Sequence, residues 1–146
     1  ASDGDWVSMR HWNRVLIKFH SAIGVAGDDP TLTIEQAKDN AGGSAKGLNF
    51  DTIYRKQAAT DLTGVGAWTK TTQTAASTYT EATAAEQSLI WIVEIKAEDL
   101  DVANDFTHVR GRIADVGLNA QLGYMEYGLA EPAHAHAPEN VLSPLA

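Results

Sequence analysis

Cysteine is absent from the 146-residue sequence. This absence excludes disulfide bonds, thiol nucleophiles and cysteine-ligated zinc sites. A domain of about 150 residues buries roughly 68–70% of the surface that its unfolded chain exposes, so a core can form without covalent cross-links. We therefore expect a single domain that is stabilised by packing or by assembly with partners.

Positive charge is scarce: 11 Lys and Arg residues stand against 19 Asp and Glu residues, for a formal net charge of −8. A surface of this sign repels nucleic-acid phosphates and anionic lipid headgroups. We therefore expect neither a nucleic acid nor a membrane as the partner of this chain.

Long apolar runs are also missing. The longest, Leu89–Val93, has five residues, whereas a transmembrane helix needs roughly 20. The first residues, Ala1–Asp5, are polar and acidic, and they lack the basic and apolar regions of a secretory signal. We therefore expect synthesis in a cytoplasm without ordinary export.

Common catalytic and cofactor-binding motifs do not occur: there is no glycine-rich dinucleotide or Walker A loop, no Gly-x-Ser-x-Gly elbow and no His-Glu-x-x-His pair. Glu94 and Glu126 fall in separate predicted strands, and paired carboxylates on a β-sandwich can support glycoside hydrolysis. Solvent-facing strand positions explain both residues without chemistry. We therefore expect no enzymatic activity and no cofactor.

Two groups of side chains resemble metal ligands. His134 and His136, two residues apart in an extended segment, point to the same side of the chain. Asp28–Asp29 and the acidic segment Glu98–Asp105 offer oxygens of the kind that calcium prefers. The acidic segment lacks the central glycine and closing glutamate of an EF-hand loop, and the histidines lack nearby carboxylate partners. We therefore interpret both groups as solvated side chains and expect no metal.

Short segments of alternating apolar and polar residues recur along the chain, separated by glycine, proline, asparagine and aspartate. Alternation with a period of two is typical of β-strands, and a spacing near ~8–12 residues is typical of sandwiches and barrels. We predict an all-β fold, an antiparallel β-sandwich of jelly-roll or Greek-key type. The expected strands lie within residues 15–20, 31–35, 48–54, 67–83, 89–96, 107–114 and 121–129.

The segment Leu89–Lys96 is the strongest predicted strand. Its first residues are apolar on both faces, which is typical of a strand in the middle of a sheet. We expect Trp91 to lie in the core and Trp68 to lie in the core or at its rim.

The alternation also assigns faces in two other strands. In the first, the residues expected to share one face are Leu48, Phe50, Thr52 and Tyr54. In the second, Val109 and Ile113 are expected to face the core, and His108, Arg110 and Arg112 to face solvent.

We divide the chain into an N-terminal segment (residues 1–14), the sandwich domain (15–132) and an extended C-terminal arm (133–146). Trp6, Arg10 and Trp12 lie close together in the N-terminal segment, and Trp and Arg often anchor protein interfaces. These side chains could equally pack across the end of the sandwich. Trp6, Arg10 and Trp12 are candidate partner contacts, with that alternative open.

The C-terminal arm carries three apolar residues, Val141, Leu142 and Leu145, in a proline-containing stretch where no regular element is expected. Apolar side chains in an extended arm stabilise nothing unless something covers them. Docking on a neighbouring subunit would cover them; folding back on their own domain and fraying are the alternatives. We add Val141, Leu142 and Leu145 to the candidate partner contacts.

Five stretches of the sequence share residues with a known family: Asp5–Met9, Lys56–Leu62, Ala97–Phe106, Asp115–Gly117 and Glu131–Pro132. Through them the chain resembles the small structural proteins of tailed phages and prophages. The resemblance runs from Asp5 to Pro132 and does not reach the arm.

The resemblance implies a virion protein with no catalytic function. From it we infer a cement, or decoration, protein that is made in the host cytoplasm and binds the major capsid protein on the outer surface of the capsid. Proteins of this kind often occupy three-fold positions, which favours a trimer. Three alternatives stay open: a tail or head–tail connector component, a carbohydrate-binding module for host adhesion, and a jelly-roll hydrolase.

Overall fold

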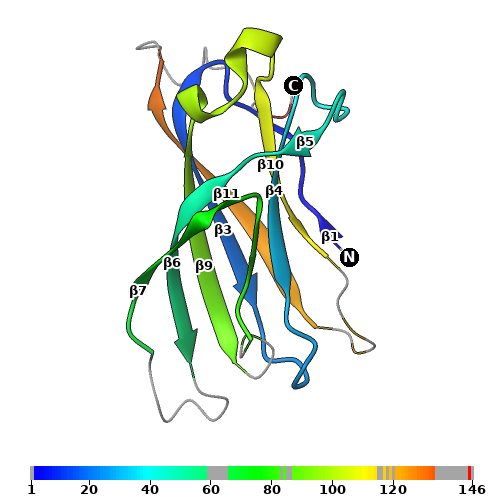
Figure 1. Cartoon of the computed structure of the whole chain (residues 1–146), viewed down its shortest axis with the longest axis vertical. Helices are drawn as coiled ribbons and strands as arrows, with labels where there is room; N and C mark the ends of the chain where they lie inside the picture. The colour runs from blue at the N-terminus through cyan, green and yellow to red at the C-terminus, as the bar shows by residue number, and fades with distance from the viewer. Residues whose placement is uncertain are drawn as a thin grey trace.

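The computed structural model describes residues 2–58, 66–82, 84, 87–114, 117, 119, 121–133 and 145. These residues form two antiparallel sheets that pack face to face (Figure 1). The predicted all-β sandwich is confirmed, while the finer choice between jelly roll and Greek key stays a prediction. None of the described segments forms a helix that could span a membrane.

One sheet has five strands in the order β11-β3-β9-β6-β7. Their bounds are β3 Trp12–Ser21, β6 Phe50–Ala58, β7 Thr69–Ala76, β9 Ser88–Lys96 and β11 Gly123–Pro132. The strand expected to be central, β9, pairs with β3 on one side and with β6 on the other. Its predicted position is therefore confirmed.

The opposite sheet is built around the pair β4 (Thr31–Ala37) and β10 (His108–Ile113). The short strands β5 and β8 pair with β4, and β1 and β2 pair with β10. Their bounds are β1 Ser2–Asp3, β2 Val7–Ser8, β5 Lys46–Gly47 and β8 Thr78–Thr80. Two 3-10 turns, η1 (Ala97–Asp99) and η2 (Val102–Asn104), lead from β9 to β10.

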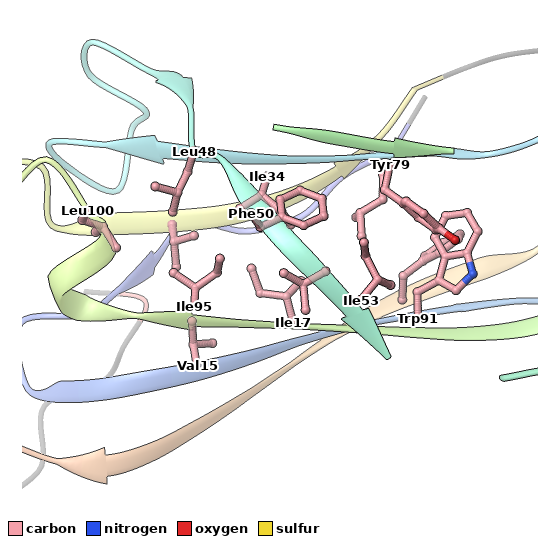
Figure 2. Packing of buried hydrophobic residues seen from close by; sticks show 14 of the residues in the cluster. Val15, Ile17, Ile34, Leu48, Phe50, Ile53, Tyr79, Trp91, Ile95 and Leu100 are labelled. Atoms are coloured by element: carbon pink, nitrogen blue, oxygen red, sulfur yellow. The ribbon is translucent and has the colours of Figure 1, made fainter. Parts of the chain in front are cut away.

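The core lies between the two sheets and is centred on Trp91. This side chain is completely buried, as its position in the pattern of β9 predicts. The ring of Tyr79 meets it edge-on with centroids 5.0 Å apart, and the ring of Phe19 lies at 5.7 Å. Figure 2 shows Tyr79 and Trp91 together at one end of the core. The inward side chains of β3, β4 and β9 form much of the remaining core: Val15, Ile17, Leu32, Ile34, Leu89, Val93 and Ile95.

Irregular pairing near the start of β6 accompanies a change in which residues face the core. From Phe50 to Thr52 the strand β6 advances by two residues, while its partner β7 advances by four, from Ala76 to Thr72, so the extra residues of this irregularity lie in β7. Phe50 and Ile53 are both buried, whereas Tyr54 is 41% exposed. Figure 2 shows Phe50 and Ile53 in the core. The prediction that Thr52 and Tyr54 share one face with Phe50 is therefore wrong, because the regular alternation of β6 is interrupted between the buried residues Phe50 and Ile53.

The N-terminal segment is extended, as expected, but it belongs to the sandwich. Ser2–Asp3 pair with one end of β10 and Val7–Ser8 with the other. Val7 and Met9 are buried, and β3 begins at Trp12, before the expected boundary at residue 15. Residues 2–9 therefore complete one edge of the β10 sheet.

Two further face assignments differ from the prediction. Val109 is buried, as expected, but His108 is buried as well, at 4% exposure. It pairs with Ser8 of β2, so the N-terminal segment lies beside a position that alternation alone assigned to solvent. Trp68 is 53% exposed, which contradicts its assignment to the core or rim. It precedes β7, which pairs with β6 alone among the residues that the structure describes.

The burial of Ile53 beside the exposed Tyr54 leads to a prediction about stability. Ile53→Ala removes a fully buried side chain and is expected to lower the free energy of unfolding by about 2–5 kcal/mol. Tyr54→Ala, the matched substitution at the adjacent exposed position, is expected to change it by only about 0.5 kcal/mol. Urea denaturation of both variants measures the difference. Equal losses, or a larger loss for Tyr54→Ala, would show that β6 lacks this register.

Candidate partner-binding surface

The structure separates the three candidate contacts near the N-terminus. Trp6 is buried: the guanidinium of Arg110 lies 4.5 Å from its ring. Gly42, which has a φ of +80°, passes so close that an added Cβ would lie 2.7 Å from Trp6 Nε1. Trp6 thus packs within the domain, the second of the two alternatives considered for it.

The other two N-terminal residues lie nearer the surface but not together. Arg10 is exposed in the turn before β3, and Trp12 is half-buried at the start of β3, opposite Pro132. With Trp6 in the interior, these residues do not make a continuous exposed patch. Arg10 and Trp12 remain candidate contacts.

Only one of the three arm residues lies in the described part of the chain. Leu145 is 54% exposed, which leaves part of its side chain accessible to a partner. Val141 and Leu142 lie outside the described residues, as do His134 and His136. The hypothesis that the arm docks on a neighbour stays a prediction.

Glu94 and Glu126 lie on the two strands that flank β3, and each forms an ion pair with it. Arg14 Nη1 lies 2.9 Å from Glu94 Oε1, and Lys18 Nζ lies 2.8 Å from Glu126 Oε1. The hydrogen bond and charge of Lys18 lower the pKa of Glu126, the opposite of the shift that a general acid needs. These contacts favour a structural role for both carboxylates.

The acidic segments considered for calcium direct their oxygens toward donors of the chain itself. Asp101 forms an ion pair with Lys46 and accepts a 2.9 Å hydrogen bond from Asn104. Asp99 accepts a 2.8 Å bond from the backbone N–H of Lys96. Asp28 accepts bonds from the backbone and side chain of Asn119. Within the described ranges no three His, Asp or Glu side chains form a group that could hold a metal ion.

The outward side chains of the five-stranded sheet form a different surface, called the outer face below. Directly paired residues of neighbouring strands point to the same side of a sheet, and alternate residues of β3 and β9 are buried. The register therefore places the intervening residues together on the side away from the core. They are Arg14, Leu16, Lys18, His20, Tyr54, Lys56, Lys70, Ile90, Ile92, Glu94, Lys96, Tyr124 and Glu126.

The charge of the outer face is opposite in sign to that of the whole chain. It carries Arg14, Lys18, Lys56, Lys70 and Lys96, five of the 11 basic residues. Its two acidic members, Glu94 and Glu126, form ion pairs with β3, and two neighbouring carboxylates, Glu131 and Glu98, pair with Arg14 and Lys96. Among the described residues, Lys56 and Lys70 have no ion pair. An acidic protein thus presents one face with an excess of positive charge.

Aromatic and aliphatic side chains share this face with the lysines. Tyr54 and Tyr124 are 41% and 61% exposed. The ring of Tyr124 stacks on His20 with centroids 4.5 Å apart and an interplanar angle of 7°. Leu122, the residue before β11, is 80% exposed. Exposed aromatic and aliphatic groups beside unpaired cations are typical of a surface that binds a partner.

The outer face is not predicted by the sequence pattern as a continuous surface, although the residues that form it are all present in that pattern. Alternation identifies which residues leave the core, but it does not say which strands are neighbours. The four residues Lys56, Ile90, His20 and Tyr124 form one cross-strand row because β6, β9, β3 and β11 pair in that order. The expected candidates lie close together in sequence, whereas these four residues come from four separate strands.

Comparison of the chain with protein-family models, with curated proteins and with solved structures returns no match.

The buried side chain of His108 leads to a prediction about how stability depends on pH. Burial, and then the charge of Arg10, lowers the pKa of His108, while the carboxylate of Asp39 and the carbonyl of Lys38 act in the opposite direction. The folded state therefore resists protonation of this ring. Near pH 6.5 and below, where an unperturbed histidine binds a proton, the unfolded state takes up more protons than the folded state.

We expect the free energy of unfolding to fall as the pH is lowered from about 7.5 to about 5.5. The free energy of unfolding of the His108→Gln variant should fall less over the same pH interval, because the glutamine side chain does not titrate. Urea denaturation at several pH values measures both slopes. Equal slopes for the two proteins would assign the pH dependence to other groups.

Proposed function

We propose that this chain is a non-enzymatic structural protein of a phage virion, which binds the outer surface of the capsid and stabilises the shell. The observation that carries the proposal is the outer face: a sheet surface on which Lys56 and Lys70 have no ion pair among the described residues, on a chain of net charge −8. The similarity of five sequence stretches to small phage structural proteins supports the same function.

A sheet face suits binding to a shell made of many identical subunits. The outer face is held by backbone pairing across five strands, so it needs little ordering when it binds, and such preorganisation favours affinity. Each contact need not be strong, because copies repeated over a symmetric shell add up through avidity. In this proposal the partner is the major capsid protein, and the protein is a trimer located on the capsid surface.

The edge of the same sheet offers a second mode of contact. The edge strand β7 (Thr69–Ala76) has Lys70 as its one charged residue, contains no proline, and pairs irregularly with β6 only between Thr72 and Ala76. Natural edge strands are commonly protected by charges, prolines or bulges, and the regular part of such an edge can accept an extended segment by strand addition. Among the described residues β7 pairs with β6 alone, so its other edge supports this mode.

A carbohydrate-binding module is the second candidate. Tyr54, Tyr124 and Trp68 are all exposed aromatic residues, and aromatic rings form the stacking surfaces of many sugar sites. Against it, the exposed surface of the hollow beside Tyr124 is almost entirely apolar, although polar residues are among those that line it. Sugar hydroxyls need hydrogen-bond partners, which an apolar surface does not supply. The arrangement therefore favours a protein partner.

Sedimentation of the purified protein with capsid shells that lack it tests the proposal. We expect the protein to co-sediment at a fixed stoichiometry and to raise the temperature at which the shells rupture, because a ligand that binds the assembled state stabilises it. The mass of the free protein in solution is measured in parallel.

Other outcomes of this experiment point elsewhere. A protein that stays in the supernatant is not a cement protein, and a closed ring of identical subunits would indicate a tail or connector component. Binding on a glycan array, together with no binding to shells, would support the carbohydrate-binding alternative.

A further inference from the structure

A groove of about 350 Å³ opens at one end of the outer face. Its walls come from the end of β3, the start of β9, the end of β6 and the residues that lead into β11, and they include His20, Ala58, Ile90, Leu122 and Tyr124. These segments are distant in sequence, and they meet because of the strand order β11-β3-β9-β6.

We propose that this groove receives an apolar side chain from an extended, acidic segment of the capsid protein. The inference rests on the proposed function and adds to it the position of the contact and the chemistry of the partner. It makes the groove, rather than the N-terminal tryptophans, the main anchor of the complex.

The walls of the groove select an apolar group. Leu122 is 80% exposed and Tyr124 is 61% exposed, so both lose contact with water when a side chain enters between them. Burial of apolar area is the main favourable term in protein association. Large exposed groups beside a hollow are also where a few residues supply most of the binding energy.

Two lysines indicate the charge of the partner. Lys56, which pairs with Ile90, lines the groove, and Lys70 lies on the neighbouring edge strand opposite Tyr54. Neither lysine has an ion pair within the described part of the chain, whereas Lys18 is neutralised by Glu126. A segment with carboxylates on either side of its apolar residue would satisfy both free ammonium groups.

The same charges argue against a second copy of the chain in the groove. Two outer faces brought together would place the unpaired lysines of one copy against those of the other, and juxtaposed like charges oppose association. An extended segment is favoured over a globular surface because the groove is only about 350 Å³ in volume and lies at the ends of four strands of one sheet, so it admits a side chain rather than a folded surface.

The test uses the full chain, capsid shells that lack it, and four variants. Leu122→Asp places a charge in the groove, and Lys56→Glu reverses its free cation. Val102→Asp and Lys38→Glu are the matched controls. Val102 is 60% exposed in η2, which follows the opposite end of β9, and Lys38 is exposed beyond β4 in the other sheet. Circular dichroism and thermal unfolding verify that all four variants fold.

We expect Leu122→Asp to weaken co-sedimentation with shells at least about tenfold, as for a residue at the centre of an interface. Lys56→Glu should weaken it as well and reduce its dependence on salt, because salt screens the attraction that this lysine provides. Both control variants should bind like the wild type.

Three results would overturn the inference. If the wild type binds shells and Leu122→Asp binds equally well, the groove is not the contact, although the proposed function stands. If the controls weaken binding as much as the groove variants do, the effect is one of overall charge. If Leu122→Asp changes the mass of the free protein in solution, the groove joins copies of the chain. Failure of the wild type to bind shells removes the inference together with the proposed function.

Discussion

The pairing of β9 between β3 and β6 is the constraint on which the rest of the structure depends. Trp91, Val93 and Ile95 are directed inward against the opposite sheet, and this burial leaves the intervening residues of β9 on the outside. Because the neighbouring strands are in register with β9, the direction of its side chains is transmitted across the sheet. The core and the outer face are therefore two consequences of one set of backbone hydrogen bonds.

The distribution of charge follows from this arrangement. Arg14 and Lys18 on β3 lie between Glu94 on β9 and Glu126 on β11, so the middle of the outer face is neutralised internally. Lys56 and Lys70 lie toward the other edge, where no carboxylate of the outer face reaches them. The acidic side chains of the turn region are occupied in part by local partners, as Asp101 is by Lys46 and Asn104. An excess of acid in the whole chain thus coexists with a basic strip on one sheet.

Much of the fold could be predicted from the sequence because it depends on local alternation. The strands around Ile17, Ile34 and Trp91 are predicted correctly, since each buries one face, and a shift of its register by one residue would expose its apolar side chains. Prediction failed where the backbone departs from a regular strand or where a distant segment covers a position. The irregular pairing of β6 with β7 accompanies a change in the faces of Ile53 and Tyr54, and the N-terminal strand β2 pairs with β10 at His108.

The candidate surface depended far more on tertiary structure. Composition and periodicity by themselves determined an all-β chain of acidic net charge, without cysteine chemistry, and with Trp91 in its core. They did not determine which strands are neighbours, because hydrogen bonds between strands join residues of any separation in sequence. Only the tertiary structure placed Lys56, Ile90, His20 and Tyr124 in one row and moved Trp6 into the interior. Alternation is a local property of each strand, whereas a binding surface is a property of their order.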